Sequence, residues 1–201
     1  MKRLLILFLM AFITCSTFAQ DEVMAKIAER YKNMKTLTAQ VTQTKHNALV
    51  TKDVVTKGTF YFKQPSKMLI TLTTGKDKLL MNGSSFTLMQ NGKVNKANGK
   101  GNKTFEALSA VLKGFATGQK SDVDINEYAD VEMTKKGNLV ILEIEPYDKG
   151  KKPMFTSLVL TVDTKALELK SLRMNEKGKN YTQYDFSNYK FNAPIEDSVF
   201  Y

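Results

Sequence analysis

Side chains that could carry out catalysis or hold a metal are scarce in this chain. It has one histidine, His46, and one cysteine, Cys15. A catalytic nucleophile usually needs a base beside it, but His46 stands between Lys45 and Asn47 in a predicted polar turn, where we interpret it as a surface residue. A zinc site needs three or four nitrogen, sulfur or carboxylate ligands. The sequence therefore predicts neither nucleophilic catalysis nor a zinc site.

Two pairs of acidic residues are the remaining candidates for a metal or for acid–base chemistry. Asp122 and Asp124 are not followed by the regularly spaced oxygen ligands and closing glutamate of a calcium loop. Glu143 and Glu145 alternate along a strand pattern, as residues on the solvated face of a sheet do. The glycines of residues 95–102 lack phosphate-loop spacing. We expect a protein that is not an enzyme, with no metal and no cofactor.

Residues 1–19 have the pattern of a secretory signal peptide. Lys2-Arg3 is a basic start, and the apolar run Leu4–Ile13 is too short for a typical membrane-spanning helix. Thr17-Phe18-Ala19 places small residues three and one before a cleavage site. Cleavage there leaves residues 20–201, a length that suits one domain with a substantial core.

Cys15 leaves one alternative open, a lipoprotein signal in which this cysteine is acylated. The residues before it, Phe12-Ile13-Thr14, lack the leucine and the small residue usual in such a signal. If Cys15 is removed with the signal peptide, the mature chain contains no cysteine, which excludes disulfides and thiolate metal sites.

The chain is basic, with a formal net charge of +10 that falls to +8 without Lys2 and Arg3. The basic residues are spread along the sequence rather than gathered in long runs. One interpretation is a solvated surface that aids solubility, and the other is attraction to an anionic membrane surface or an acidic partner. We expect no nucleic-acid partner for an exported protein.

The most informative pattern runs from Gly58 to Gly83. Phe60 and Phe62 alternate with polar neighbours, which is the period of a strand with one buried face. Gln64-Pro65-Ser66 interrupts the pattern, because proline has no N–H for a strand ladder. A second strand carries Met68, Ile70 and Leu72, and a third, from Lys78 to Met81, leads into the hairpin signal Asn82-Gly83.

Further strand patterns fill most of the remaining chain. We predict strands over the following segments: 36–43, 85–90, 93–97, 131–135, 139–145, 155–163, 167–175 and 181–188. Two segments instead have helical spacing, 21–35 and 105–115. Ten or eleven short strands with regular turns indicate an antiparallel sandwich or barrel rather than a parallel α/β sheet.

Flexible apolar side chains are abundant, with eight methionines after residue 19. Methionine fills irregular gaps in ordinary cores, and it is also common on surfaces that accept variable apolar ligands. Both interpretations remain open from the composition alone.

The ordered set of motifs resembles the periplasmic outer-membrane lipoprotein carrier proteins over nearly the whole mature chain. The motifs that carry the resemblance are Leu37-x-Ala39-x-Val41-x-Gln43, Gly58-x-Phe60-x-Phe62-Lys63-Gln64-Pro65, Asn82-Gly83, Leu142-x-Ile144-x-Pro146, Leu160-x-Val162-Asp163, Phe186-x-Asn188 and Asn192-Ala193-Pro194-Ile195. The resemblance implies a mainly β (α+β) fold, an open, incomplete antiparallel β-barrel with an α-helical lid.

The resemblance also implies a function. Such proteins carry the acyl chains of lipoproteins across the periplasm from an inner-membrane releasing complex to the outer membrane. The alternative is a related module with the same fold that binds another lipid or senses envelope stress. We expect a monomer whose partners are acylated lipoproteins, the releasing complex and an unidentified outer-membrane acceptor.

The candidate ligand-binding residues are large apolar side chains of the strands, chosen as inward-facing by their size. They are Phe60, Phe62, Met68, Ile70, Leu72, Leu80, Phe86 and Leu88. The lid candidates are Phe105, Leu108, Leu112 and Phe115, which form one apolar stripe between glycine-rich flanks. We expect this helix to close the barrel when it is empty and to move aside when it is loaded.

One departure from the family concerns the lid. Many members have an arginine next to the proline of the strand motif, and this arginine helps hold the lid shut. Here the neighbours of Pro65 are Lys63, Gln64, Ser66 and Lys67.

The signal-peptide interpretation predicts the start of the exported protein. We expect its N-terminus at Gln20 and its recovery in the soluble envelope fraction, as measured by intact-mass spectrometry and N-terminal sequencing. Recovery from the membrane fraction with an acylated Cys15 at the N-terminus would contradict it.

Overall fold

The computed structural model describes residues 26, 29–31, 33–83, 85–90, 92–98, 129–147 and 155–201. These residues form eleven strands and very little helix. The strands are β1 (Thr36–His46), β2 (Val54–Lys63), β3 (Lys67–Leu72), β4 (Lys78–Asn82), β5 (Ser85–Gln90), β6 (Lys93–Asn98), β7 (Ala129–Lys136), β8 (Leu139–Pro146), β9 (Ser157–Asp163), β10 (Glu168–Asn175) and β11 (Tyr181–Phe191). Two 3-10 turns, η2 (Lys177–Lys179) and η3 (Asp197–Phe200), complete the described elements.

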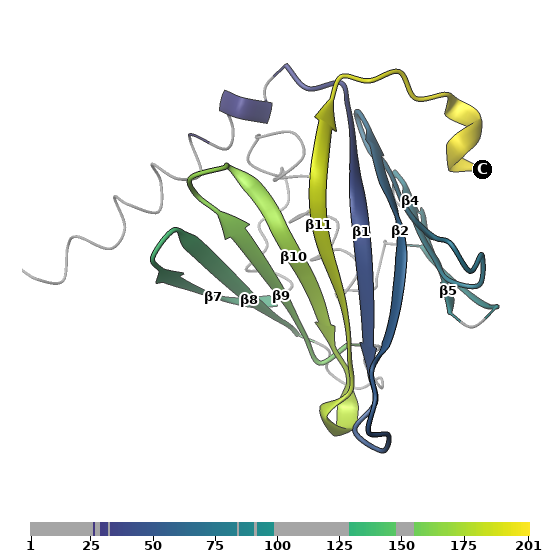
Figure 1. Ribbon diagram of the computed structural model, residues 1–201, viewed down its shortest axis with the longest axis vertical. Coiled ribbons are helices and arrows are strands. Elements are labelled where there is room, and N and C mark those ends of the chain that lie inside the picture. Colours follow the sequence, from purple (N-terminus) through teal and green to yellow (C-terminus); the bar gives the residue numbers. More distant parts are fainter. Residues whose placement is uncertain are drawn as a thin grey trace, which may run out of the picture.

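All eleven strands belong to one antiparallel sheet with the order β6-β5-β4-β3-β2-β1-β11-β10-β9-β8-β7. The chain starts at the centre with β1 and runs to the edge at β6, then resumes at the other edge with β7 and returns to pair β11 with β1. The sheet curls along its width around the long central strands (Figure 1). Because β6 and β7 are the two edges, the sheet is open, and the prediction of an open antiparallel barrel is confirmed.

Side-chain alternation gives this sheet two different faces. We call the face that carries the main core cluster the inner face, and the opposite one the outer face. On β1 the inner positions are Leu37, Ala39 and Val41, and they pair in register with Phe62, Phe60 and Gly58 of β2. Because successive residues of a strand point to opposite faces, the register puts most of the large buried apolar residues of the strands other than the edge strand β6 on one face.

The predicted hairpins form where the sequence signals them. Gly83 and Gly92 have φ of +61° and +79°, the left-handed backbone that tight hairpin turns require. Several strand boundaries differ from prediction. Strand β1 continues past Gln43 to His46, and β7 begins at Ala129 rather than at Val131. Strand β9 begins at Ser157 rather than at Phe155, and β11 continues past Asn188 to Phe191.

The first predicted helix is described at Lys26 and residues 29–31, all of which are helical, and the chain has left the helix by Met34. The C-terminal end of this helix is held by polar contacts to the start of β10 and the turn before it. The Tyr31 hydroxyl donates to the Leu167 carbonyl at 3.0 Å, and Arg30 pairs with Glu168 at 3.2 Å.

Two sequence predictions lie outside the described residues. They are the signal peptide, residues 1–19, and the helix 105–115 with the lid candidates Phe105, Leu108, Leu112 and Phe115.

Gly58 marks a close approach between β2 and β3. A Cβ atom at this position would lie 2.2 Å from the Thr71 carbonyl oxygen and 2.7 Å from Cδ2 of Leu72. The first of these atoms belongs to the backbone and cannot rotate away. Only glycine therefore lets β2 and β3 keep their pairing at Gly58 and Leu72.

We predict that Gly58→Ala lowers the free energy of unfolding by about 1–3 kcal/mol, because the added methyl group forces the two strands apart. Urea unfolding followed by circular dichroism measures the change. Thr59→Ala, on the same strand and the opposite face, is the control and should have a smaller effect. Equal stability of Gly58→Ala and the unmodified protein would show that the strands can separate without loss.

Candidate functional site

The predicted ligand-binding residues of β2, β3 and β5 lie together on the inner face. Seven of the eight belong to the main core cluster, with exposures from 1% at Phe62 to 8% at Phe60. They are Phe60, Phe62, Met68, Ile70, Leu72, Phe86 and Leu88. The register places Phe62 beside Met68 and Phe60 beside Ile70, so these side chains form continuous rows across the strands.

Leu80 is the exception, and its assignment to this face was wrong. On β4 the inner positions are Leu79 and Met81, and Leu80 points to the outer face, where it packs with Leu69, Ile195 and Phe200. The run Leu79-Leu80-Met81 is apolar at every position, so size alone could not distinguish the faces. The outer position of Leu80 is covered by the C-terminal segment with Ile195 and Phe200, which lies more than a hundred residues away in the sequence.

The other half of the inner face was missed at the sequence level. Strands β8 to β10 contribute fully buried side chains to the same cluster: Ile144, Leu158, Leu160, Leu172 and Met174. Their alternation was visible in the sequence, but the order of strands was not. Among the described strands, only the pairing of β1 with β11 joins these strands to β2, β3 and β5 as one surface.

On β1, β2, β4, β5 and β11 the inner face becomes polar at one end, whereas at the same end of β10, β9 and β8 it stays apolar, with Met174, Leu158 and Ile144. Along β1 the inner positions change from Val41 to Gln43 and then Lys45. The neighbouring strands change at the same end. The polar inner positions there are Thr56 on β2, Asp77 before β4, Gln90 at the end of β5 and Thr182 on β11. We call this set, with Gln43 and Lys45, the polar end of the inner face.

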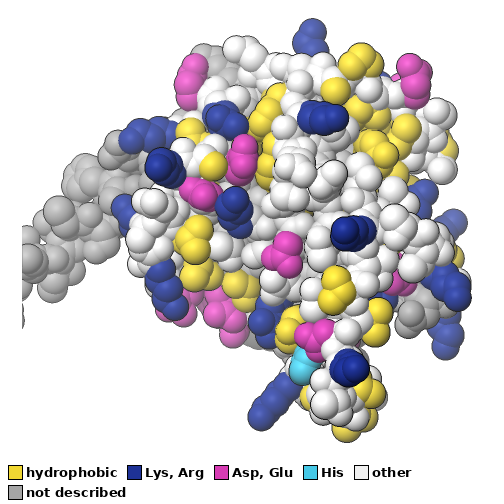
Figure 2. Space-filling view, viewed as in Figure 1, with side chains coloured by type: hydrophobic (Ala, Val, Ile, Leu, Met, Phe, Trp, Pro, Cys, Tyr) yellow, Lys and Arg dark blue, Asp and Glu magenta, His cyan; other side chains and the backbone are white. Residues whose placement is uncertain are grey.

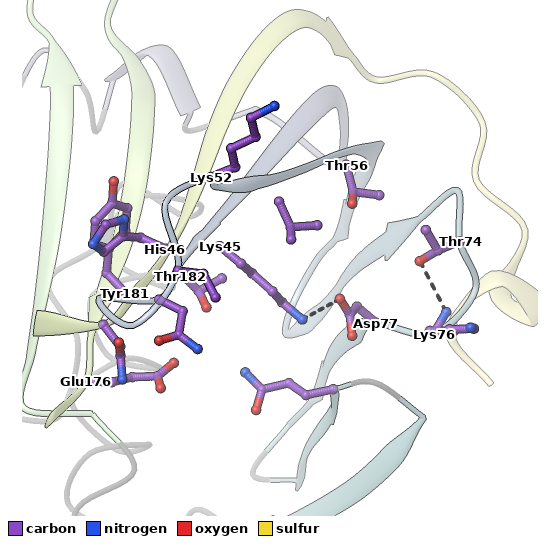
Figure 3. A pocket seen from close by; sticks show the side chains of 15 residues that line it. Lys45, His46, Lys52, Thr56, Thr74, Lys76, Asp77, Glu176, Tyr181 and Thr182 are labelled. Carbon is purple, nitrogen blue, oxygen red and sulfur yellow. Dashed lines mark hydrogen bonds and ion pairs between the residues drawn. The ribbon is translucent and has the colours of Figure 1, made fainter. Parts of the chain in front are cut away.

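A pocket of about 450 Å³ lies at the polar end. Its walls include Lys45, Thr56, Asp77, Gln90 and Thr182, together with residues of the turns at this end of the sheet, among them Glu176. Lys45 reaches across the pocket to Asp77, with 2.5 Å between Nζ and Oδ2 (Figure 3). This ion pair joins β1 to the start of β4 across the two strands between them.

Next to this pair, a buried amide and a buried phenol form a second polar contact. Gln43 donates from Nε2 to the hydroxyl of Tyr184 at 3.1 Å. Burial raises the pKa of Tyr184 to about 12, so the phenol stays neutral at physiological pH. The other amide atom, Oε1 of Gln43, is buried and has no hydrogen-bond partner among the described residues.

His46 is the last residue of β1 rather than part of the following turn. Its Nδ1 lies 2.7 Å from Oδ1 of Asp53, and its ring stacks on Tyr181 with 4.8 Å between centroids. Arg173 also lies over the Tyr181 ring, at 3.6 Å from its centroid. These contacts tie together the ends of β1, β10 and β11.

Lys63 and Lys67, which flank the proline motif, are directed to the outer face. Both ammonium groups bind Asp197, at 3.1 Å and 2.8 Å, and Lys63 also donates to the Ile195 carbonyl at 2.9 Å. Ile195 and Phe200 are buried there against Leu69. The lysines at this motif therefore hold the C-terminal segment against the outside of the sheet.

The visible outer surface carries lysine and arginine side chains scattered among acidic ones, without one dominant cluster (Figure 2). In the part of the chain that the structure describes, no helix has the length and apolar character needed to cross a bilayer. The same residues contain no group of three or more potential metal ligands.

Comparison with models of known protein families identifies the family of this chain. The family model of the outer membrane lipoprotein carrier protein LolA matches residues 32–201. The chain belongs to the LolA family. The match spans every described strand, so the open sheet and both of its faces belong to the LolA-like part of the chain. A search of curated proteins gave no match.

Three solved structures are among those similar to this chain. A DUF1329 family protein from Desulfovibrio piger has 13% identity and a TM-score of 0.47, covering 91% of this chain and 96% of that one. A putative outer membrane lipoprotein-sorting protein domain from Vibrio parahaemolyticus has 13% identity and a TM-score of 0.46, with coverages of 89% and 94%. A LolA superfamily protein from Nitrosomonas europaea has 9% identity and a TM-score of 0.41, with coverages of 90% and 96%.

The attachment of the C-terminal segment is predicted to depend on pH. Hydrogen bonds from Lys67 and Lys63 lower the pKa of Asp197 below its ordinary value. A carboxylate with a lowered pKa stabilises the folded state above its unfolded pKa of about 3.9, and this contribution is lost as the pH falls through the folded pKa. We therefore expect the segment to loosen in acid and, at neutral pH, in Asp197→Asn.

The backbone ¹⁵N relaxation of Val199 and Phe200 measures this mobility. Glu196→Gln removes the neighbouring carboxylate, which forms no ion pair among the described residues, and should leave the segment attached. Unchanged relaxation in Asp197→Asn would mean that the apolar contacts of Ile195 and Phe200 hold the segment without the ion pairs.

Proposed function

We propose that this protein binds the acyl chains of lipoproteins against its inner face and carries them through the periplasm to the outer membrane. The observation that carries the proposal is the match to the lipoprotein carrier family over residues 32–201. The apolar inner face supplies a surface of the right chemistry for such a ligand.

The free energy of exposing acyl chains to water explains why a carrier is needed. One chain of about 15 methylenes exposed to water costs roughly 12 kcal/mol, at ~0.8 kcal/mol for each methylene. A lipoprotein with several chains therefore leaves a membrane slowly unless another apolar surface replaces the bilayer. Rows of buried Phe, Leu, Ile and Met side chains, such as those containing Phe62, Met68 and Leu88, offer that replacement.

The protein must also release its ligand, and the composition of the inner face suits apolar binding of low specificity. Met68, Met81 and Met174 are buried on this face. Methionine is unbranched and adapts to irregular partners. Apolar contact is non-directional, so chains can slide along the face or leave it without breaking a set of matched hydrogen bonds.

The partners and the lid form part of the same proposal. We propose that an inner-membrane releasing complex loads the protein and that an outer-membrane acceptor receives the lipoprotein. The stripe of Phe105, Leu108, Leu112 and Phe115 is the proposed lid over the loaded face.

The proposal predicts that a charge on the inner face strongly weakens ligand binding. In Phe62→Glu a carboxylate would have to be buried against the acyl chain, so we expect the affinity for a synthetic diacylated lipopeptide to fall about tenfold or more. Fluorescence titration with a labelled lipopeptide measures the affinity, and thermal melting checks that the variant is folded.

The matched control is Val55→Glu, which places the same charge on the outer face of the same strand, at a residue that is 61% exposed. It should bind like the unmodified protein. If Phe62→Glu does not fold, the neutral variant Phe62→Gln tests the same surface with a smaller penalty. Undiminished binding in a folded variant at Phe62 would show that the chains lie elsewhere.

A further inference from the structure

We propose that the polar end of the inner face binds the polar junction of the ligand, the neutral ester and amide groups that join acyl chains to a peptide. The chains would lie along the apolar rows, and the peptide would leave past the turns at the end where β1 meets β2. This inference rests on the proposed function and deepens it, because it gives the ligand a direction within the site.

The first argument is the distribution of polarity along the inner face. On β1, β4 and β5 the inner residues change from apolar to polar toward one end, where Lys45, Asp77 and Gln90 lie. At the opposite end the inner positions are Leu37, Phe62 and Met81, all of which are buried in the core cluster. An acylated peptide has the same order of polarity, with long chains and one polar junction. Only one orientation places both parts against matching residues.

The second argument is the ion pair between Lys45 and Asp77. The side chains are 20% and 12% exposed, so both charges are largely withdrawn from water. Partly buried ions need further hydrogen bonds besides their mutual attraction. A lysine ammonium carries three donors, of which Asp77 takes one. The carbonyl oxygens of an ester or amide are suitable acceptors for the others.

The third argument is the unsatisfied amide oxygen of Gln43. In the part of the chain that the structure describes, Oε1 of Gln43 is buried without a hydrogen-bond partner, while its Nε2 donates to Tyr184. Gln43 is the inner residue next to Lys45 along β1. A buried acceptor without a donor is costly. Gln43 is 1% exposed and lies behind the pocket lining, so the N–H of an amide at the ligand's junction would satisfy this oxygen once the Gln43 side chain turns toward the pocket.

The charges around the pocket are close to balanced and suit a neutral group, since three lysines, Lys45, Lys52 and Lys76, line it together with two carboxylates. Lys45 is already paired with Asp77, and Glu176 adds a second carboxylate to the lining. The side chain of Lys52 points away from the pocket (Figure 3). The volume of about 450 Å³ lies within the range of small-molecule sites and can hold a polar junction of this size.

A lipopeptide with a nitroxide label tests the orientation directly. The probe is a synthetic diacylated cysteinyl peptide, labelled in one preparation on the peptide and in another at the end of an acyl chain. Paramagnetic broadening of backbone amide signals in the purified protein reports which residues each label approaches. The peptide label should broaden Lys45 and Thr182, and the chain label should broaden Phe62 and Met81. The reverse pattern, or equal broadening at both ends, would overturn the orientation while leaving acyl binding intact.

Substitution of the ion pair tests its contribution to affinity. Lys45→Met combined with Asp77→Leu removes both charges, and we expect it to weaken lipopeptide binding about tenfold while leaving an apolar dye, N-phenylnaphthylamine, bound as before. Lys57→Met makes the same change on the outer face of β2 and should alter neither. If the double variant does not fold, the single variants Asp77→Asn and Lys45→Gln are measured in its place. Unchanged lipopeptide affinity in folded variants would overturn the assignment, whereas a failure of the unmodified protein to bind any lipopeptide would overturn the proposed function itself.

Discussion

The hydrogen-bonded pairing of β1 with β11 is the interaction on which the rest of the structure depends. The chain builds the strands β1 to β6 first and β7 to β11 last, and this pairing joins the two sets into one sheet. It also fixes their register, with Val41 opposite Phe186 and Gln43 opposite Tyr184. Because a shift of one residue would turn every side chain of a strand to the other face, this register decides which side chains share the inner face.

Two features follow from that register. The large apolar residues of both halves meet as one cluster, and the polar residues near the ends of β1, β4, β5 and β11 gather at one end of it. The outer face has a separate use, since Lys63 and Lys67 hold the C-terminal segment against it through Asp197. A carrier of acylated peptides needs an apolar surface for the chains and a polar place for their junction, and the inner face offers both.

Strand positions could be predicted from the sequence because alternation is local, as at Phe60 and Phe62, and because Asn82-Gly83 specifies a hairpin. Properties that depend on distant residues could not be predicted. Leu80 was assigned to the wrong face because its outer partners, Ile195 and Phe200, come from the far end of the chain. The pair of Lys45 and Asp77 also went unnoticed, because no sequence pattern links two single charges 32 residues apart.

The central claim is that the inner face holds lipoprotein acyl chains, and lipid extraction tests it most directly. The protein would be purified without detergent from the envelope of cells that make it, and the extracted material identified by mass spectrometry. We expect acylated peptides in near-stoichiometric amounts, and a large reduction in the Phe62→Glu variant. Another lipid in their place would indicate a lipid-binding module of different function, and the absence of any bound lipid would contradict the claim, because the inner face would then be only the protein's own core.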